Sequence, residues 1–269
     1  LASSAASDVY KRQSMKKFRV IATVIVITAF SVTLALLSKK IFTDKAEDEK
    51  LKNLITTEEP SGTGQNVTGS SVFQRNADYL NELSQQNSDC IGWLKVSGCG
   101  IDYPVMYCKE DPEFYLHANF DKEYSGIGTP YVDGFCTPLG DKRSDNVIIY
   151  GHNISSGEMF HYLNRYENEE FYQKHKYIQF DTLDGPGEYE VIAAFRYVAW
   201  SNDDTEHYHF LEFRDAANEN EFNEFVKNAQ ELTPFKTATA KYGDKLIMLS
   251  TCAYHAENGR FAVVAKKID

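Results

Sequence analysis

Short runs of β-branched and aromatic residues, separated by turn-forming residues, fill the chain from residue 91 onward. Runs of this length and composition predict short strands, and eight of them at this spacing indicate a closed or nearly closed barrel. The fold class is therefore expected to be mainly β. The expected strands cover residues 93–96, 101–106, 129–132, 147–150, 177–180, 189–200, 245–249 and 261–268.

Four segments show helical rather than strand spacing. Apolar residues at 72, 73, 79, 80 and 83 predict a helix ahead of the barrel, and residues 158–166 and 168–175 predict short helices after the fourth strand. The longest stripe lies between the sixth and seventh strands. It consists of Phe222, Phe225, Val226, Ala229 and Leu232.

An uncharged apolar run of eighteen residues covers positions 20–37, and basic residues cluster before it. This length just crosses a bilayer, and basic residues favour the cytoplasmic side. We therefore expect a single-pass protein of the cell membrane with a cytoplasmic N-terminus and an exported domain. Because no small-residue cleavage site follows the run, an uncleaved signal anchor is favoured over a removed signal peptide.

The organisation expected from these patterns has four parts. Residues 1–14 resemble nothing functional and are expected to be a non-native extension. Residues 15–41 form the cytoplasmic stub and the membrane anchor. Residues 42–71, charged and then rich in Gly, Ser and Thr, are expected to form a flexible linker. Residues 72–269 are expected to form the extracellular domain.

The charge of the chain is uneven. The chain has 28 basic and 39 acidic residues, of which 10 basic and 7 acidic ones precede residue 72. The domain therefore holds 18 basic and 32 acidic residues, a net charge of −14. A domain this acidic argues against a nucleic-acid partner.

Three chemically active residues lie at predicted strand ends. Cys252 follows the seventh strand, Arg260 precedes the eighth, and His152 follows the fourth. Taken alone, each is most often a structural residue: a buried thiol, a histidine whose hydrogen bonds are made within the core, or a cation that shields a sheet edge. Together they supply a sulfur nucleophile, a proton-transfer group and a cation for a developing oxyanion, the set that acyl transfer needs.

The motifs around these residues resemble the sortase transpeptidases. The resemblance rests on Tyr-Gly-His-Asn at 150–153, Leu-Ser-Thr-Cys at 249–252, and the arginine shortly after the cysteine. The second motif is similar to the family pattern T-L-x-T-C, with Met248 where the first Thr usually stands. The long helix between the sixth and seventh strands and the N-terminal helix resemble class B in particular. The resemblance covers roughly residue 72 to the C-terminus.

This resemblance implies a mechanism without metal or organic cofactor. Cys252 would attack the Thr carbonyl of an N-P-x-T-x sorting signal in a secreted surface protein and form a thioester. His152 would act as general acid and base, and Arg260 would stabilise the oxyanion. A peptidoglycan amine would then resolve the thioester. A pilin-polymerising sortase, a hydrolytic cell-wall cysteine peptidase and an inactive membrane-tethered binding domain stay open as alternatives.

Further residues are candidates for substrate binding. Ser250 and Thr251 either line the site or pair within their strand, and Asn153 could orient the histidine region. Tyr208 and His209, in the connection before the inserted helix, could contact the peptide. The other cysteines do not show zinc-site spacing, and their disulfide state stays open. They are Cys90, Cys99, Cys108 and Cys136.

Overall fold

The computed structural model describes residues 2–54 and 69–268 and divides the chain into two compact units, Leu1–Lys45 and Ala46–Asp269. A long helix, α1 (Ala2–Lys52), covers the first unit and runs into the second. Within the described residues, its part Ile21–Lys52 is the one helix long and apolar enough to cross a membrane. The predicted anchor lies in this helix.

Both ends of the segment 42–71, which was expected to be a flexible linker, are helical. Residues up to Lys52 are helical, and helix α2 (Gly69–Gln86) already includes residues 69–71. Residues 42–52 contain good helix formers and an Asp48–Lys52 ion pair of 2.8 Å at the i,i+4 spacing that supports a helix. Residues 55–68, which hold most of the Gly, Ser and Thr, lie outside the described residues.

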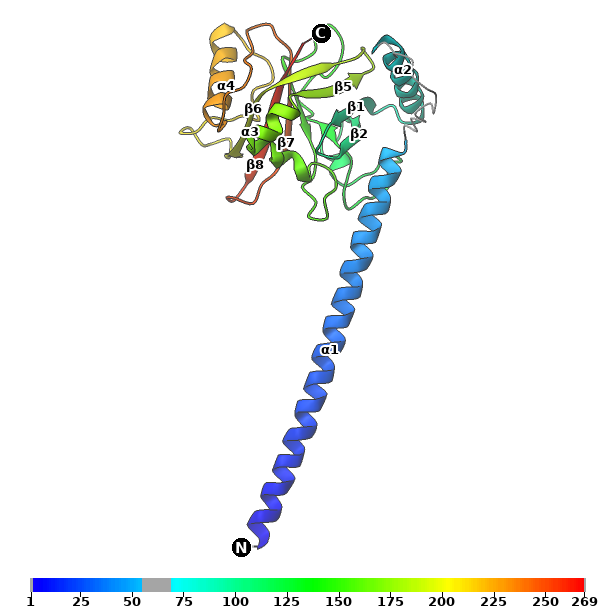
Figure 1. Ribbon diagram of the computed structural model, residues 1–269, viewed down its shortest axis with the longest axis vertical. Coiled ribbons are helices and arrows are strands. Elements are labelled where there is room, and N and C mark those ends of the chain that lie inside the picture. The colour runs from blue at the N-terminus through cyan, green and yellow to red at the C-terminus, as the bar shows by residue number, and fades with distance from the viewer. Residues whose placement is uncertain (1, 55–68, 269) are drawn as a thin grey trace. The chain divides into compact units, whose positions relative to one another are not determined.

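The second unit is built on a closed barrel of eight strands (Figure 1), which confirms the predicted fold class. Its order around the barrel is β1-β2-β3-β4-β7-β8-β6-β5. Two neighbouring pairs, β2·β3 and β4·β7, are parallel, and the others are antiparallel. The strands are β1 (Cys90–Val96), β2 (Ile101–Met106), β3 (Tyr131–Val132), β4 (Asn146–Tyr150), β5 (Tyr177–Thr182), β6 (Glu188–Val198), β7 (Leu246–Cys252) and β8 (Gly259–Lys267).

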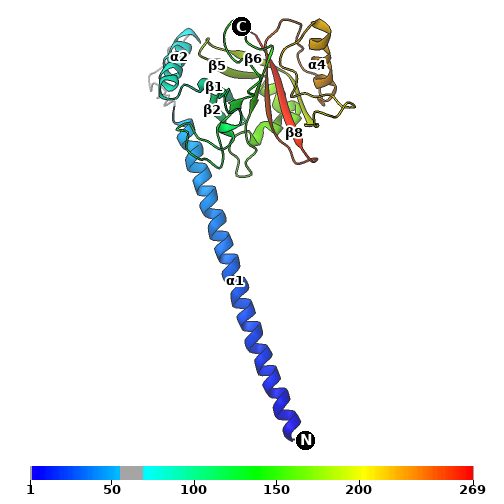
Figure 2. The same ribbon diagram turned by 180° about the vertical axis from the view of Figure 1, so that it is seen from behind.

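Two helices flank the barrel on opposite sides, as the front and back views show (Figures 1 and 2). Helix α2 buries Leu80 and Leu83, whereas the side chains at 72 and 73 lie outside the described ones. Helix α4 (Glu219–Glu231) is the predicted insertion between β6 and β7. Its apolar face is buried, and Phe225 stacks on Phe213 with ring centroids 4.1 Å apart. Leu232 departs from the predicted stripe because it caps the helix and is 49% exposed.

Residues 158–166 do not form the predicted helix, but the side chains that the pattern predicted to be buried are buried. Residues His161–Glu167 form a 3-10 helix, η2, and helix α3 (Glu169–Lys174) follows it. A helix cannot begin at 158, because Met159 has a φ of 56°, in the left-handed region. The four apolar side chains of the stripe are all buried. They are Met159, Phe160, Leu163 and Tyr166. One further 3-10 turn, η1 (Phe114–Leu116), precedes β3.

Candidate active site

The pairing of three strands brings the predicted catalytic residues together. Strands β4 and β7 run parallel with Tyr150 opposite Ser250, so both end at the same rim of the barrel. His152 and Cys252 each stand two residues beyond that pair. Strands β7 and β8 are antiparallel, and Cys252 is directly opposite Arg260. All three residues line one cavity of about 450 Å³.

The imidazole of His152 is held by a backbone carbonyl from a distant part of the chain. Its Nε2 lies 2.8 Å from the carbonyl oxygen of Leu116, at the end of η1. A carbonyl can only accept a hydrogen bond, so Nε2 carries the proton, and Nδ1 of the neutral ring is left as an acceptor. This contact therefore decides which ring nitrogen can receive a proton.

The surroundings of His152 favour its neutral form. Burial lowers the pKa of His152 below its usual value, the bond to the Leu116 carbonyl opposes this, and His117 lowers the pKa further. The rings of His117 and His152 are 5.7 Å apart between centroids. We therefore expect a neutral imidazole near pH 7, ready to accept a proton at Nδ1.

The guanidinium of Arg260 keeps its charge available to the cavity. The side chain is half-buried, and its Nη1 donates to the carbonyl of Gly259 at 3.1 Å. Among the described residues, no carboxylate forms an ion pair with it. A cation beside Cys252 that no carboxylate neutralises is suited to a negative charge that develops during a reaction.

Comparison with known proteins agrees with this geometry. The family model described as a sortase domain matches residues 94–268. The chain belongs to the sortase family. Sortase B of Staphylococcus aureus is 32% identical over 188 residues, covering 69% of this chain and 73% of the relative. Sortase B of Listeria monocytogenes is 29% identical over 194 residues, covering 71% and 74%.

Solved structures place this sortase in class B. A mutant form of Clostridium perfringens sortase B matches with a TM-score of 0.68 and 27% identity, over 84% of this chain and 99% of that one. A Staphylococcus aureus sortase B-substrate complex matches with a TM-score of 0.63 and 28% identity, over 72% and 86%. The chain is thus a cysteine transpeptidase of the class B type that serves cell-wall anchoring of surface proteins.

The hydroxyl groups beside the cysteine of this sortase bond to neighbouring strands. Thr251 Oγ1 donates to the carbonyl of Gly151 at 2.7 Å, and Ser250 Oγ shares a hydrogen bond of 2.9 Å with the Tyr197 hydroxyl. Both residues line the cavity, yet both are buried. Their side chains therefore bind β7 to the end of β4 and to β6.

The side chain of Asn153 joins the histidine and cysteine strand ends. Its Nδ2 donates to the carbonyl of Cys252 at 2.8 Å, and its Oδ1 lies 2.7 Å from Nδ1 of His161. Because Oδ1 can only accept, His161 donates this bond. Asn153 is not among the cavity-lining residues, and His161 carried no sequence signal because its partner depends on the fold.

The two candidates before helix α4 are not among the residues that line the candidate cavity. Tyr208 packs edge-on against Phe210, with ring centroids 4.9 Å apart. His209 lines a second cavity of about 580 Å³, and its Nε2 donates to the carbonyl of Asp204 at 2.9 Å. The two cavities share Phe135, Tyr150 and Leu211 as lining residues. Tyr208 and His209 thus do not share a cavity with Cys252, His152 and Arg260.

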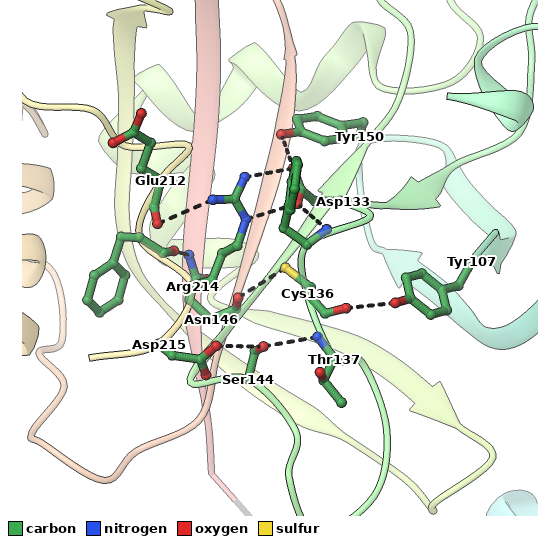
Figure 3. A network of polar contacts seen from close by, with 12 residues as sticks. Tyr107, Asp133, Cys136, Thr137, Ser144, Asn146, Tyr150, Glu212, Arg214 and Asp215 are labelled. Carbon is green, nitrogen blue, oxygen red and sulfur yellow. Dashed lines mark hydrogen bonds and ion pairs between the residues drawn. The ribbon is translucent and has the colours of Figure 1, made fainter. Parts of the chain in front are cut away.

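An ion pair at the wall of the cavity, formed by the buried Asp133 and the half-buried Arg214, had no sequence signal (Figure 3). Asp133 follows β3 and accepts bonds from Arg214 at 2.9 and 3.2 Å and from the Tyr150 hydroxyl at 2.9 Å. Arg214 belongs to the connection between β6 and α4. The pair joins residues 81 positions apart, so only the fold reveals it. It ties this connection to the end of β4, next to His152.

All five cysteines of the chain are free thiols. Burial raises the pKa of Cys90 and Cys99 to about 12 each and that of Cys136 to about 11. Cys108 and Cys252 are half-exposed. The three buried thiols are therefore expected to react slowly. No disulfide joins the five cysteines, whose pairing the sequence left open.

Proposed function

We propose that this class B sortase cleaves an N-P-x-T-x sorting signal after Thr and joins the released carboxyl group to a peptidoglycan amine. The observation that carries the proposal is the convergence of Cys252, His152 and Arg260 on one cavity, with Cys252 and Arg260 in register on adjacent strands. The solved sortase B-substrate complex among the structural neighbours supports a peptide substrate for this fold.

The first half of the reaction forms a thioester. Neutral His152 accepts the thiol proton of Cys252 at Nδ1, and the thiolate attacks the Thr carbonyl. Arg260 donates to the oxyanion of the tetrahedral intermediate. His152 then returns the proton from Nδ1 to the departing amine while the Leu116 carbonyl holds Nε2–H. The same carbonyl stabilises the imidazolium formed between these steps.

The second half runs in reverse with another amine. His152 Nδ1 takes a proton from the incoming peptidoglycan amine, which attacks the thioester carbonyl. Arg260 again stabilises the oxyanion, and Cys252 leaves as a thiolate that His152 reprotonates. An amide bond forms as the thioester bond breaks, so the reaction needs no external energy source or redox partner.

The proposal includes a location for the enzyme. The apolar helix within Ile21–Lys52 would span the membrane, with the basic residues before it on the cytoplasmic side. The catalytic domain would then lie outside the cell, where surface proteins and peptidoglycan meet.

The test uses the full chain in detergent with quenched N-P-x-T-x and L-P-x-T-G peptides. We expect cleavage of the N-P-x-T-x peptide after Thr, and its loss in Cys252→Ala, His152→Ala and Arg260→Ala. Product analysis with and without an added amine separates transpeptidation from hydrolysis. Joining to the side chain of a pilin lysine would instead favour pilus assembly. Cleavage that survives Cys252→Ala would refute the mechanism, and absence of both cleavage and thioester would leave a binding domain.

A further inference from the structure

The last two turns of α1, residues 46–52, belong to the same compact unit as the barrel. We call them the docked segment. Leu51 joins the hydrophobic core, and Asp48 is only 9% exposed. Glu47 accepts a bond of 2.5 Å from the Ser125 hydroxyl, and Lys50 forms an exposed ion pair of 2.5 Å with Asp121. The segment is thus packed on the domain by apolar and polar contacts.

The buried contact of the docked segment is with a tyrosine of a barrel strand. Tyr103, on β2, is fully buried, and its hydroxyl donates to the carboxylate of Asp48. The same hydroxyl accepts the backbone N–H of Met159 at 3.2 Å. A phenol has a single proton, and the amide must be the donor in the second bond, so the proton of Tyr103 is committed to Asp48. Lys52, 2.8 Å from Asp48, balances the charge of that carboxylate.

Met159 lies in the loop that carries His152. Its backbone forms an isolated bridge with Asn153, and the N–H of the next residue, Phe160, donates to the carbonyl of His152 at 2.9 Å. Met159 also adopts a φ of 56°, which an ordinary residue keeps only when its surroundings hold it there. The bond from its N–H to Tyr103 is one of those surroundings.

We propose that Asp48 and Tyr103 are positioning residues that connect the end of the anchor helix to the loop of the catalytic histidine. Asp48 fixes the Tyr103 hydroxyl, Tyr103 fixes Met159, and Met159 holds the loop that places His152 and Asn153. The docked segment is then a working part of the catalytic domain and not a spacer. This inference depends on the proposed role of His152 as general acid and base.

The contacts also predict which changes matter. Asp48→Ala removes the acceptor of the tyrosine proton, and Tyr103→Phe removes both bonds of the hydroxyl. Asp48→Asn keeps an oxygen that can accept the tyrosine proton and is the conservative variant. Lys50→Ala is the matched control, because it breaks an exposed ion pair of the same segment.

The experiment measures kcat and KM of these full-chain variants in detergent with the N-P-x-T-x peptide, below their unfolding midpoints. We expect Asp48→Ala and Tyr103→Phe to lower kcat by on the order of tenfold with KM nearly unchanged, as displacement of a catalytic group does. The double variant should be no worse than Tyr103→Phe alone, because both changes act through one hydroxyl. Asp48→Asn should recover most of the activity, and Lys50→Ala should match wild type.

Amide hydrogen exchange gives a readout that does not depend on turnover. The peptide covering residues 152–161 should exchange faster in Asp48→Ala and Tyr103→Phe than in wild type or Lys50→Ala. Should Tyr103→Phe fail to fold, Asp48→Ala alone decides the question. Wild-type kcat and exchange in folded Asp48→Ala would overturn the inference. Failure of the proposed function is a different result, namely cleavage that persists in His152→Ala or Cys252→Ala.

Discussion

Replacing Asn153 by alanine is expected to slow catalysis without weakening peptide binding. The change removes the bond of 2.8 Å to the Cys252 carbonyl and the bond of 2.7 Å from His161. Each such bond contributes about 1 kcal/mol net, so about 2 kcal/mol is lost in total. If all of it holds the two strand ends in their reactive arrangement, kcat falls by about 30-fold; if only a quarter does, by about twofold. KM should stay constant because Asn153 does not line the cavity.

A second variant sharpens this prediction. Asn153→Asp keeps an oxygen for His161 but places a carboxylate oxygen where the amide N–H met the Cys252 carbonyl. Two oxygens that can only accept repel each other, so this variant should be slower than Asn153→Ala although it is closer to the native residue in shape.

The assay measures kcat and KM on the N-P-x-T-x peptide, together with thermal unfolding. Asn168→Ala is the control, because the Asn168 side chain also bonds to the backbone, here by accepting from Phe171 N at 3.0 Å, but at the start of α3. It should cost about 1 kcal/mol of stability and leave kcat unchanged. Wild-type kcat in folded Asn153→Ala, or an Asn153→Asp faster than Asn153→Ala, would show that the bridge does not position the site.

Three further outcomes follow from the structure. Arg214→Ala leaves the buried Asp133 without its cation and should lower the free energy of unfolding by about 3 kcal/mol in urea titration, against less than about 1 kcal/mol for Lys50→Ala. Burial lowers the pKa of His152, so the unfolded state binds more protons than the folded state as the pH falls. Wild type should therefore lose stability below about pH 6.5, and it should lose more than His152→Gln does. Equal losses in the two proteins would contradict this. Native protein treated with iodoacetamide should be alkylated at the half-exposed Cys108 and Cys252 only, and all five thiols should react after denaturation; mass spectrometry that finds a third label on native protein would disprove it.

Local patterns predicted most of the barrel because each strand is a short run of β-branched and aromatic residues bounded by turn residues. All eight strands were expected. The seventh, predicted over 245–249, extends to Cys252, and the third, predicted over 129–132, is limited to Tyr131–Val132. Pro130 has no N–H for a ladder and only accepts a bond from Met106 N at 2.9 Å, so the run stays outside the strand. Residues 158–166 show the opposite case. Their apolar spacing correctly predicted the buried side chains, but the backbone is held in part by the bond of Met159 to Tyr103, 56 positions away.

The sequence by itself determined the number of strands and their succession along the chain, the apolar span near the N-terminus and the three residues proposed for catalysis. Each depends on a short run or a motif that can be recognised without knowing which residues surround it in the fold. Tertiary structure alone decided which nitrogen of His152 carries a proton, which atoms Asn153 bridges and where Asp48 is buried. Those outcomes depend on partners 36, 99 and 55 positions away. Two of the partners are backbone carbonyls, which every residue has, so no residue type in the sequence could reveal them.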